Sequence, residues 1–191
     1  FMTTPSFMDS YEAAVALMHG QRQTVGFDLE NAGFVLSFGA GLLDGPATVF
    51  AVNRPALAVP AGNPGGVNGL ADLADPGLLV GVCAEQVPCG MVAAVVFGDA
   101  GVVPSIDTAE PNVRSLLTKI EAGELDAGIV YVTDLRAAAA VEEVALPEPR
   151  PSTPYPIAAL EDAPPAAAAF VEFVLSAEGR EILAGYGFET P

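Results

Sequence analysis

Residues 78–97 read LLVGVCAEQVPCGMVAAVVF, and this stretch decides the fold. The apolar run at 78–83 is typical of a buried strand, and a short polar loop follows it. Pro88 stands where the first turn of a helix accepts proline, so we expect a helix over residues 89–97 in which Gly90 permits close packing. A strand that leads through a tight loop into a helix is the building unit of an α/β domain.

The same alternation of strands and helices continues on both sides of this unit. The expected strands are residues 34–38, 55–60, 127–132, 144–146 and 157–160. The expected helices are residues 9–18, 70–74, 113–122, 135–140, 166–175 and 177–186. A proline-rich link at residues 147–156 leads to the last strand. We therefore expect an α/β fold with a mostly parallel sheet, and ligands bound at the carboxyl ends of its strands.

The composition is that of a protein with a substantial core, and the charge excludes two classes of partner. The chain has 191 residues, of which 51% are hydrophobic, enough for one domain or two small lobes. Seven basic residues stand against 24 acidic ones, and the formal charge of −17 repels nucleic-acid phosphates and anionic lipid surfaces. Every apolar stretch is interrupted before it reaches the roughly 20 residues of a membrane-spanning helix.

The start of the chain and its cysteines bear on the compartment. The sequence begins at Phe1 and lacks the pattern of an export signal in its first 20 residues, so either a signal has been removed or the sequence is a fragment. Cys83 and Cys89 are the two cysteines, too few for a zinc site with four cysteine ligands. In an exported protein they would form a disulfide between strand and helix, whereas in a reducing compartment they would remain two buried thiols.

Three short segments have a chemistry that suits a small anion. They are Val87-Pro88-Cys89-Gly90, Glu110-Pro111-Asn112-Val113-Arg114 and Gly128-Ile129-Val130-Tyr131-Val132-Thr133-Asp134. The first two are expected to open helices and the third to end a strand, which would place the amides of Cys89 and Val113 and the phenol of Tyr131 around the anion. Helix N-termini offer unpaired N–H groups and roughly half a positive charge, so no cationic side chain is required. The alternative for Tyr131 is a core tyrosine with its hydroxyl at the rim.

The rest of the sequence offers no catalytic set of residues. His19 is the single histidine, and no Ser–His–Asp arrangement is evident around it. The glycines at 39 and 41 lack the third glycine of a dinucleotide-binding fingerprint, because Asp44 stands in its place. The adjacent glutamates at 142 and 143 are expected to lie on a solvated face. We therefore expect no enzyme, no cofactor and no metal cation bound directly by side chains.

Seven segments resemble one protein family. They are residues 54–64 (RPALAVPAGNP), 70–73, 83–90 (CAEQVPCG), 111–117, 121–134 (EAGELDAGIVYVTD), 155–158 and 185–188. In this order they are similar to the periplasmic molybdate-binding proteins of ABC transporters, from about residue 47 to the end. The resemblance implies a type II periplasmic-binding-protein fold, two α/β lobes joined by crossing strands with the oxyanion between them. It also implies that Cys89, Val113 and Tyr131 contact the ligand.

The front of the chain departs from that family. The two serine-bearing segments with which the family opens are not evident, and residues 4–45 instead resemble a segment of molybdopterin-dependent oxidoreductases of the dimethyl-sulfoxide-reductase superfamily. Ser37, beside two glycines, is the candidate replacement donor. We expect three parts: an oxidoreductase-like segment at residues 1–45, a remnant of the first lobe at 46–61 and 153–191, and the second, oxyanion-binding lobe at 62–152. The first lobe is thus expected to be incomplete or rebuilt.

Two functions follow from these resemblances. The favoured one is a periplasmic or extracellular solute-binding protein, a monomer that captures molybdate or tungstate and delivers it to an ABC transporter permease. Its affinity is expected to be weakened by the altered N-terminus, because each missing donor is worth about 1.5–3 kcal/mol to a charged ligand. The alternative is a non-catalytic fragment or fusion of a molybdopterin-dependent oxidoreductase.

Overall fold

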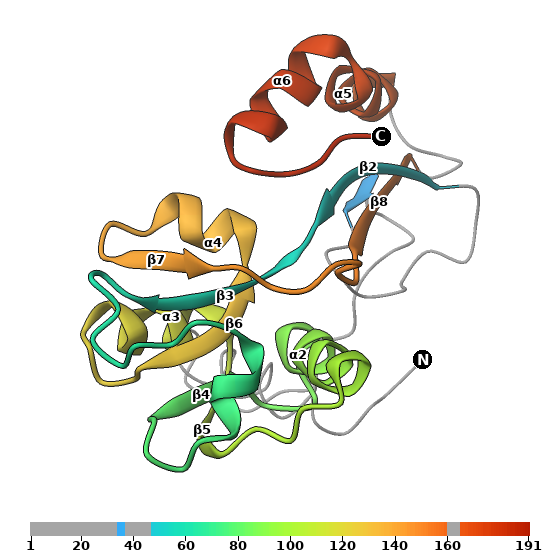
Figure 1. Cartoon of the computed structure of the whole chain (residues 1–191). Helices are drawn as coiled ribbons and strands as arrows, with labels where there is room; N and C mark the ends of the chain where they lie inside the picture. Colours follow the sequence, from blue (N-terminus) through green and yellow to red (C-terminus); the bar gives the residue numbers. More distant parts are fainter. Residues whose placement is uncertain (1–33, 37–46, 160–164) are drawn as a thin grey trace, which may run out of the picture. The chain divides into compact units, whose positions relative to one another are not determined.

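The computed structural model describes residues 34–36, 47–159 and 165–191, and all of them belong to one compact unit, Gly33–Pro191 (Figure 1). The expected helix at residues 9–18, His19 and Ser37 lie outside the described residues, as does most of the segment that resembles oxidoreductases.

A small antiparallel sheet has the strand order β1-β8-β2, with bounds Phe34–Leu36, Thr153–Ala159 and Thr48–Asn53. Two helices, α5 (Pro165–Leu175) and α6 (Ala177–Gly185), pack against β8 and β2. The core between them contains Phe50, Tyr155 and Ile157. The rings of Phe50 and Phe188 each meet Tyr155 edge to face, with centroids 6.4 Å and 5.4 Å away.

The expected link at residues 147–156 is wrong in its second half, because β8 begins at Thr153 and includes Pro154 and Pro156. Pairing with β1 begins only at Ile157. The two prolines therefore break no hydrogen bond with β1, which is the condition under which a strand accepts proline.

The larger sheet has the strand order β5-β4-β6-β3-β7. In that order its strands are Ile106–Glu110, Val80–Cys83, Ala127–Tyr131, Pro55–Pro60 and Val141–Val144. Strand β4 runs parallel to β5 and β6, whereas β3 runs antiparallel to β6 and β7. The expectation of a mostly parallel sheet is therefore wrong. The reason lies in the connections: β3 enters directly from β2 rather than through a helix, so no βαβ unit fixes its direction.

Helices cover both faces of the larger sheet. Along β3, Leu57 and Val59 belong to one core cluster, while Ala56 and Ala58 belong to another, as the alternation of side chains along a strand requires. The first cluster includes residues of α2 (Pro88–Ala100) and of the short helix η1 (Leu70–Ala74). The second includes residues of α3 (Val113–Glu121) and α4 (Val132–Ala137). Burial on both faces explains the uninterrupted apolar sequence of β3.

The boundary expected between residues 61 and 62 falls after β3, a strand of the larger sheet. Two segments connect the sheets: Arg54, between β2 and β3, and residues 145–152, between β7 and β8. They are tied together, since Arg54 Nη1 donates to the carbonyl oxygen of Arg150 at 2.9 Å and Arg150 Nη1 donates to that of Pro55 at 3.4 Å. The guanidinium of Arg54 also pairs with Glu189 at 2.7 Å.

Within the described ranges, none of the helices is both long and apolar enough to cross a lipid bilayer.

Candidate functional site

The topology of the larger sheet brings to one edge the three segments whose chemistry suits a small anion. Strands β5, β4 and β6 are neighbours and run in the same direction, so their last residues, Glu110, Cys83 and Tyr131, lie at the same edge. Each of these residues is followed within a few positions by a helix. The side chains of Cys89, Val113 and Tyr131 belong to one apolar cluster. The structure thus brings together the three residues that the resemblance implies as ligand contacts.

The first helix opening is rigid and uncapped. Val87 is the N-cap of α2 and no side chain caps the helix, while Pro88, at the first helical position, has no N–H. The amides of Gly90 and Met91 both donate to the carbonyl oxygen of Val87. No acceptor among the described residues takes the Cys89 N–H, as is usual for the first amides of a helix.

A disulfide fixes this opening to the strand. Of the two alternatives that the sequence leaves open for Cys83 and Cys89, the structure has the disulfide, with 5.7 Å between the Cα atoms. It joins the last residue of β4 to the first turn of α2. The Cys89 amide is held in place as a result.

The second helix opening is partly capped. The side chain of Asn112, the N-cap of α3, accepts the Ser115 amide at 2.9 Å. This bond satisfies the third amide of the helix and leaves the Val113 N–H without an acceptor in the described part of the chain. Val113 is half-buried and its neighbour Arg114 is exposed.

A buried carboxylate lies directly before this opening, but its charge is compensated. Glu110 is 4% exposed, and its carboxylate accepts hydrogen bonds from Lys119 and Ser115, both at 2.5 Å, and from Thr108 at 2.8 Å. These hydrogen bonds, that from Lys119 first, lower the pKa of Glu110 to about 2. The carboxylate is therefore ionised at neutral pH, and its negative charge is paired within the protein.

Tyr131 is buried and keeps its proton. Tyr131 is 8% exposed, and burial raises the pKa of its phenol to about 12. Its backbone amide donates to Asp134 Oδ2 at 2.9 Å, a contact that fixes the start of α4. Burial raises the pKa of Asp134, while that hydrogen bond and the charge of Arg114 oppose the rise. The Tyr131 hydroxyl is thus a neutral donor over the whole physiological pH range.

The sequence did not indicate two buried polar residues, Asn53 and Thr153, that contact Thr133 and Tyr131. Asn53 is 3% exposed, and its Nδ2 donates to Thr133 Oγ1 at 2.8 Å. Thr153 is 7% exposed. Both lie on or beside the segments that connect the sheets, and the sequence carried no signal that would have indicated their position beside Tyr131.

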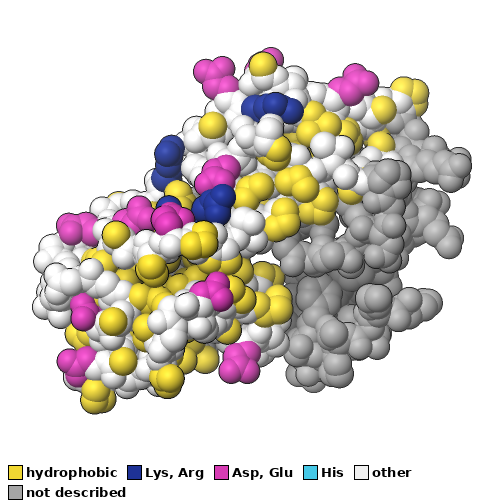
Figure 2. Space-filling model, turned by 45° about the vertical axis from the view of Figure 1, so that its right-hand side comes forward, with side chains coloured by type: hydrophobic (Ala, Val, Ile, Leu, Met, Phe, Trp, Pro, Cys, Tyr) yellow, Lys and Arg dark blue, Asp and Glu magenta, His cyan; other side chains and the backbone are white. Residues whose placement is uncertain are grey.

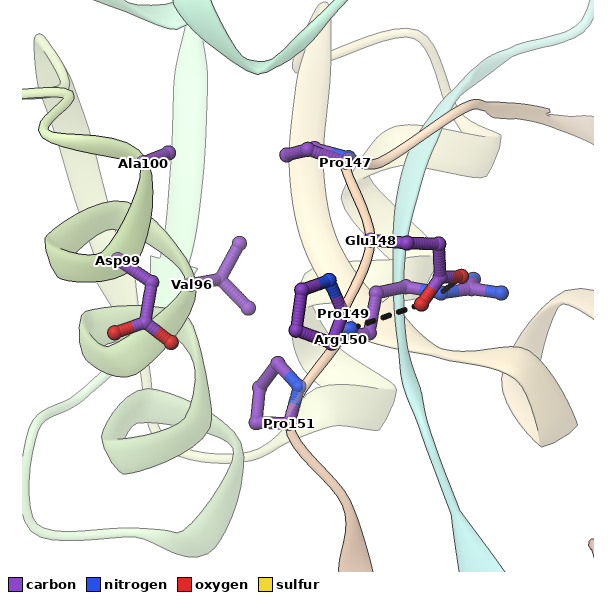
Figure 3. A pocket seen from close by; sticks show the side chains of 8 residues that line it. All are labelled: Val96, Asp99, Ala100, Pro147, Glu148, Pro149, Arg150 and Pro151. Carbon is purple, nitrogen blue, oxygen red and sulfur yellow. Dashed lines mark hydrogen bonds and ion pairs between the residues drawn. The ribbon is translucent and has the colours of Figure 1, made fainter.

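A separate pocket lies away from this edge and has a different lining (Figure 3). Its volume is about 120 Å³, and it lies between the end of α2 and the segment 147–151. The ionisable residues that line it are Asp99, Glu148 and Arg150, and Arg150 pairs with Glu148 at 2.8 Å. None of Cys89, Val113 and Tyr131 lines it.

The face shown in Figure 2 has no cluster of lysine and arginine side chains, and the described residues form no side-chain metal site. On the face shown in Figure 2, lysine and arginine side chains are scattered among acidic and uncharged ones. The described residues contain no group of three or more histidine, cysteine, aspartate or glutamate side chains able to hold a metal ion.

Comparison with known proteins gives consistent matches over nearly the whole chain. The family model described as bacterial extracellular solute-binding protein matches residues 5–189. The molybdate-binding protein ModA of Mycobacterium tuberculosis is 37% identical over 190 residues, covering 97% of this chain and 73% of the relative. The protein of the same name from Mycobacterium bovis matches equally well.

Two solved structures have the same fold. The substrate-binding domain of a putative molybdenum ABC transporter from Clostridium difficile superposes with a TM-score of 0.71 at 20% identity, covering 97% of this chain and 94% of that one. The periplasmic molybdate-binding protein of Azotobacter vinelandii gives 0.64 at 15% identity, covering 97% and 95%. At these identities the matches bear on the fold alone, and they confirm the expected binding-protein architecture.

Proposed function

Since this chain belongs to the family of bacterial extracellular solute-binding proteins, we propose that it binds molybdate, or the near-isosteric tungstate, and delivers it to an ABC transporter permease. The name of its 37% identical relatives supports the choice of ligand. Those relatives are solute-binding proteins and not enzymes. In this proposal molybdate is the cargo, and the protein has neither a cofactor nor a catalytic residue.

The binding site of this proposal consists of the Cys89 and Val113 amides and the Tyr131 hydroxyl. The observation that supports it is the juxtaposition of these residues at the carboxyl edge of three parallel strands, where neither amide donates to an acceptor among the described residues. A tetrahedral dianion gains from two helix N-termini at once, and a neutral phenol adds a directed hydrogen bond. Such a site works in a protein of net charge −17 because the donors are fixed dipoles close to the ligand.

The division into lobes remains part of the proposal. Residues 62–152, together with β3, would form the second lobe, and residues 46–54 and 153–191 would contribute to the first. The ties between Arg54 and the segment around Arg150 support a connection that bends at these residues. Closure of the lobes around the anion would then create the form that the permease accepts.

We further propose that the protein acts as a monomer in the periplasm or outside the cell. The disulfide between Cys83 and Cys89 supports an oxidising compartment. The alternative, a fragment of a molybdopterin-dependent oxidoreductase, is not favoured, since the family match extends through residues 5–45 as well.

Isothermal titration with molybdate, tungstate and sulfate tests the proposal. Molybdate or tungstate should release heat with one-to-one stoichiometry and raise the melting temperature, whereas sulfate at the same concentration should do neither. Absence of heat with both molybdate and tungstate would contradict the proposed function and leave the fold assignment unaffected.

A further inference from the structure

Glu110 is bonded to both helix openings of the candidate site. It is the last residue of β5, and its carbonyl oxygen accepts the amide of Ala84, in the loop that leads from β4 to α2, at 2.8 Å. Its carboxylate accepts the hydroxyl of Ser115, which lies in the first turn of α3. The negative charge of Glu110 therefore lies beside the helical turn that begins with Val113.

Lys119 reaches this carboxylate from the same helix. Lys119 and Ser115 are four positions apart, so they lie on one face of α3, and long side chains of a helix point towards its N-terminus. Lys119 Nζ donates to Glu110 Oε1 at 2.5 Å. The Glu110 side chain is 5% exposed and that of Lys119 is 37% exposed, so the carboxylate is shielded from water and depends on its partner for compensation of its charge.

An unpaired charge on Glu110 would oppose the binding of an anion at these openings. Electrostatic repulsion needs no contact, and it is screened less inside a protein than in water. A helix N-terminus attracts anions through a partial positive charge, which a neighbouring unpaired carboxylate offsets. Glu110 therefore affects a ligand at the start of α3 without facing it, and Lys119 decides whether that effect is repulsive.

We propose that Lys119 is a determinant of anion affinity, and that it acts by neutralising Glu110 rather than by touching the anion. The inference rests on the proposed function. In this account Glu110 joins the two helix openings through its hydrogen bonds, and Lys119 prevents the charge of Glu110 from repelling the dianion. Lys119 is thus a positioning residue for charge, placed outside the set of donors that contact the ligand.

Variants of the full chain test this assignment by calorimetric titration with sodium molybdate. Lys119→Met keeps a long side chain and removes its charge, so affinity should fall by roughly tenfold. Lys119→Arg keeps the charge and should retain most of the affinity. The double variant Glu110→Gln with Lys119→Met removes both charges and should recover most of the loss. Arg180→Met removes an exposed cation from α6 and should bind as the parent does.

The double variant separates the proposed role from a merely structural one. If Lys119 only held α3 in place, the double variant would bind as weakly as Lys119→Met, because the contact is lost in both. The proposal also predicts that Glu110→Gln alone binds at least as tightly as the parent, since the charge that remains is positive. This second prediction holds whether or not Lys119→Met folds.

The outcomes distinguish this inference from the proposed function. If the parent binds molybdate and Lys119→Met binds it equally well, the role of Lys119 is wrong and the proposed function stands. The same conclusion follows if the double variant is as weak as Lys119→Met, or if Glu110→Gln binds more weakly than the parent. If the parent binds neither molybdate nor tungstate, both the inference and the proposed function are wrong.

Discussion

Gly90 lies so close to the carbonyl oxygen of Ala84 that a methyl group on its Cα would overlap that atom. The contact joins the first turn of α2 to the residue after β4, the same junction that the disulfide between Cys83 and Cys89 closes. The placement of the Cys89 amide therefore depends on the absence of a side chain at the next position.

Gly90→Ala should destabilise the protein by about 2–4 kcal/mol, the cost of overpacking against a backbone atom that cannot move aside. Urea unfolding at neutral pH measures this change. Gly98→Ala is the matched control: it lies in the same helix, and nothing described lies within 4 Å of the added Cβ. That substitution should be neutral or stabilise by up to about 1 kcal/mol. Equal effects of the two substitutions would show that close packing at residue 90 is unimportant.

Glu110→Gln should lower stability at neutral pH by about 1–3 kcal/mol, because a buried, charge-assisted set of hydrogen bonds is weakened. The pKa of Glu110 is lowered from 4.5 to about 2 in the folded protein. Its ionised form therefore stabilises the fold fully above pH 4.5, and this contribution is lost as the pH falls through 2.

The difference in stability between the parent and Glu110→Gln should accordingly shrink between pH 7 and about pH 2.5. Denaturant unfolding of both proteins at several pH values measures it. Glu124→Gln, on the exposed turn after α3, is the control and should leave stability nearly unchanged. A difference that stays constant down to pH 2.5 would contradict a lowered pKa for Glu110.

Tyr131→Phe should weaken molybdate binding by about 1.5–3 kcal/mol, which is roughly 10- to 150-fold, by removing one donor to a charged ligand. Burial raises the pKa of Tyr131 from 10.0 to about 12, so the hydroxyl stays a donor up to at least pH 10. The ratio of the parent's affinity to that of the variant should therefore be constant from pH 7 to 10. Titration calorimetry at several pH values measures that ratio, and a ratio near one would remove Tyr131 from the site.

The raised pKa of Tyr131 also has a consequence for stability. The pKa of Tyr131 is higher in the folded protein than in the unfolded chain. The protonated phenol therefore contributes fully to the stability of the fold below pH 10, and this contribution to stability is lost as the pH rises towards 12. Tyr131→Phe should therefore lose less stability than the parent over this alkaline range.

The sequence predicted two kinds of element correctly. One is the strand that is buried on both faces of the sheet, and the other is the helix whose start is marked by a residue such as proline. Strand β3 was found at its observed bounds because its apolar run PALAVP is buried throughout. Helix α2 was found from Pro88, a local signal that does not depend on tertiary structure. The helix after Tyr131 starts three residues earlier than expected, because Asp134 accepts the Tyr131 amide and begins a turn there.

Edge strands were predicted poorly. Strand β5 was missed because most of its side chains are exposed or half-buried, and its sequence IDTAE has little apolar pattern. Strand β7 was placed three residues late, since the apolar residues at 144–146 gave a stronger signal than the polar VEEV that pairs with β3. Exposed edges do not need apolar residues, so periodicity alone cannot find them.

The candidate site was predictable where it depends on strand ends and helix starts. Cys89 and Val113 were expected at helix starts and Tyr131 at the end of a strand, and the family resemblance implied that all three contact one ligand. Thr153 and Asn53 were not found, because their contacts with Tyr131 and Thr133 depend on how two distant segments cross between the sheets. Ser37, the replacement donor suggested by the sequence, lies outside the described residues and stays a prediction.

The central claim is that a backbone amide, rather than a side chain, holds the anion at the start of α3. Val113→Pro removes that amide hydrogen at the first helical position, where proline is well accepted, and Asn112 already has the extended backbone that precedes proline. Val113→Ala trims the same side chain and keeps the amide. In a calorimetric titration with molybdate, Val113→Pro should bind roughly tenfold or more weakly than Val113→Ala, with unchanged helical circular dichroism. Equal affinity of the two variants would contradict the account.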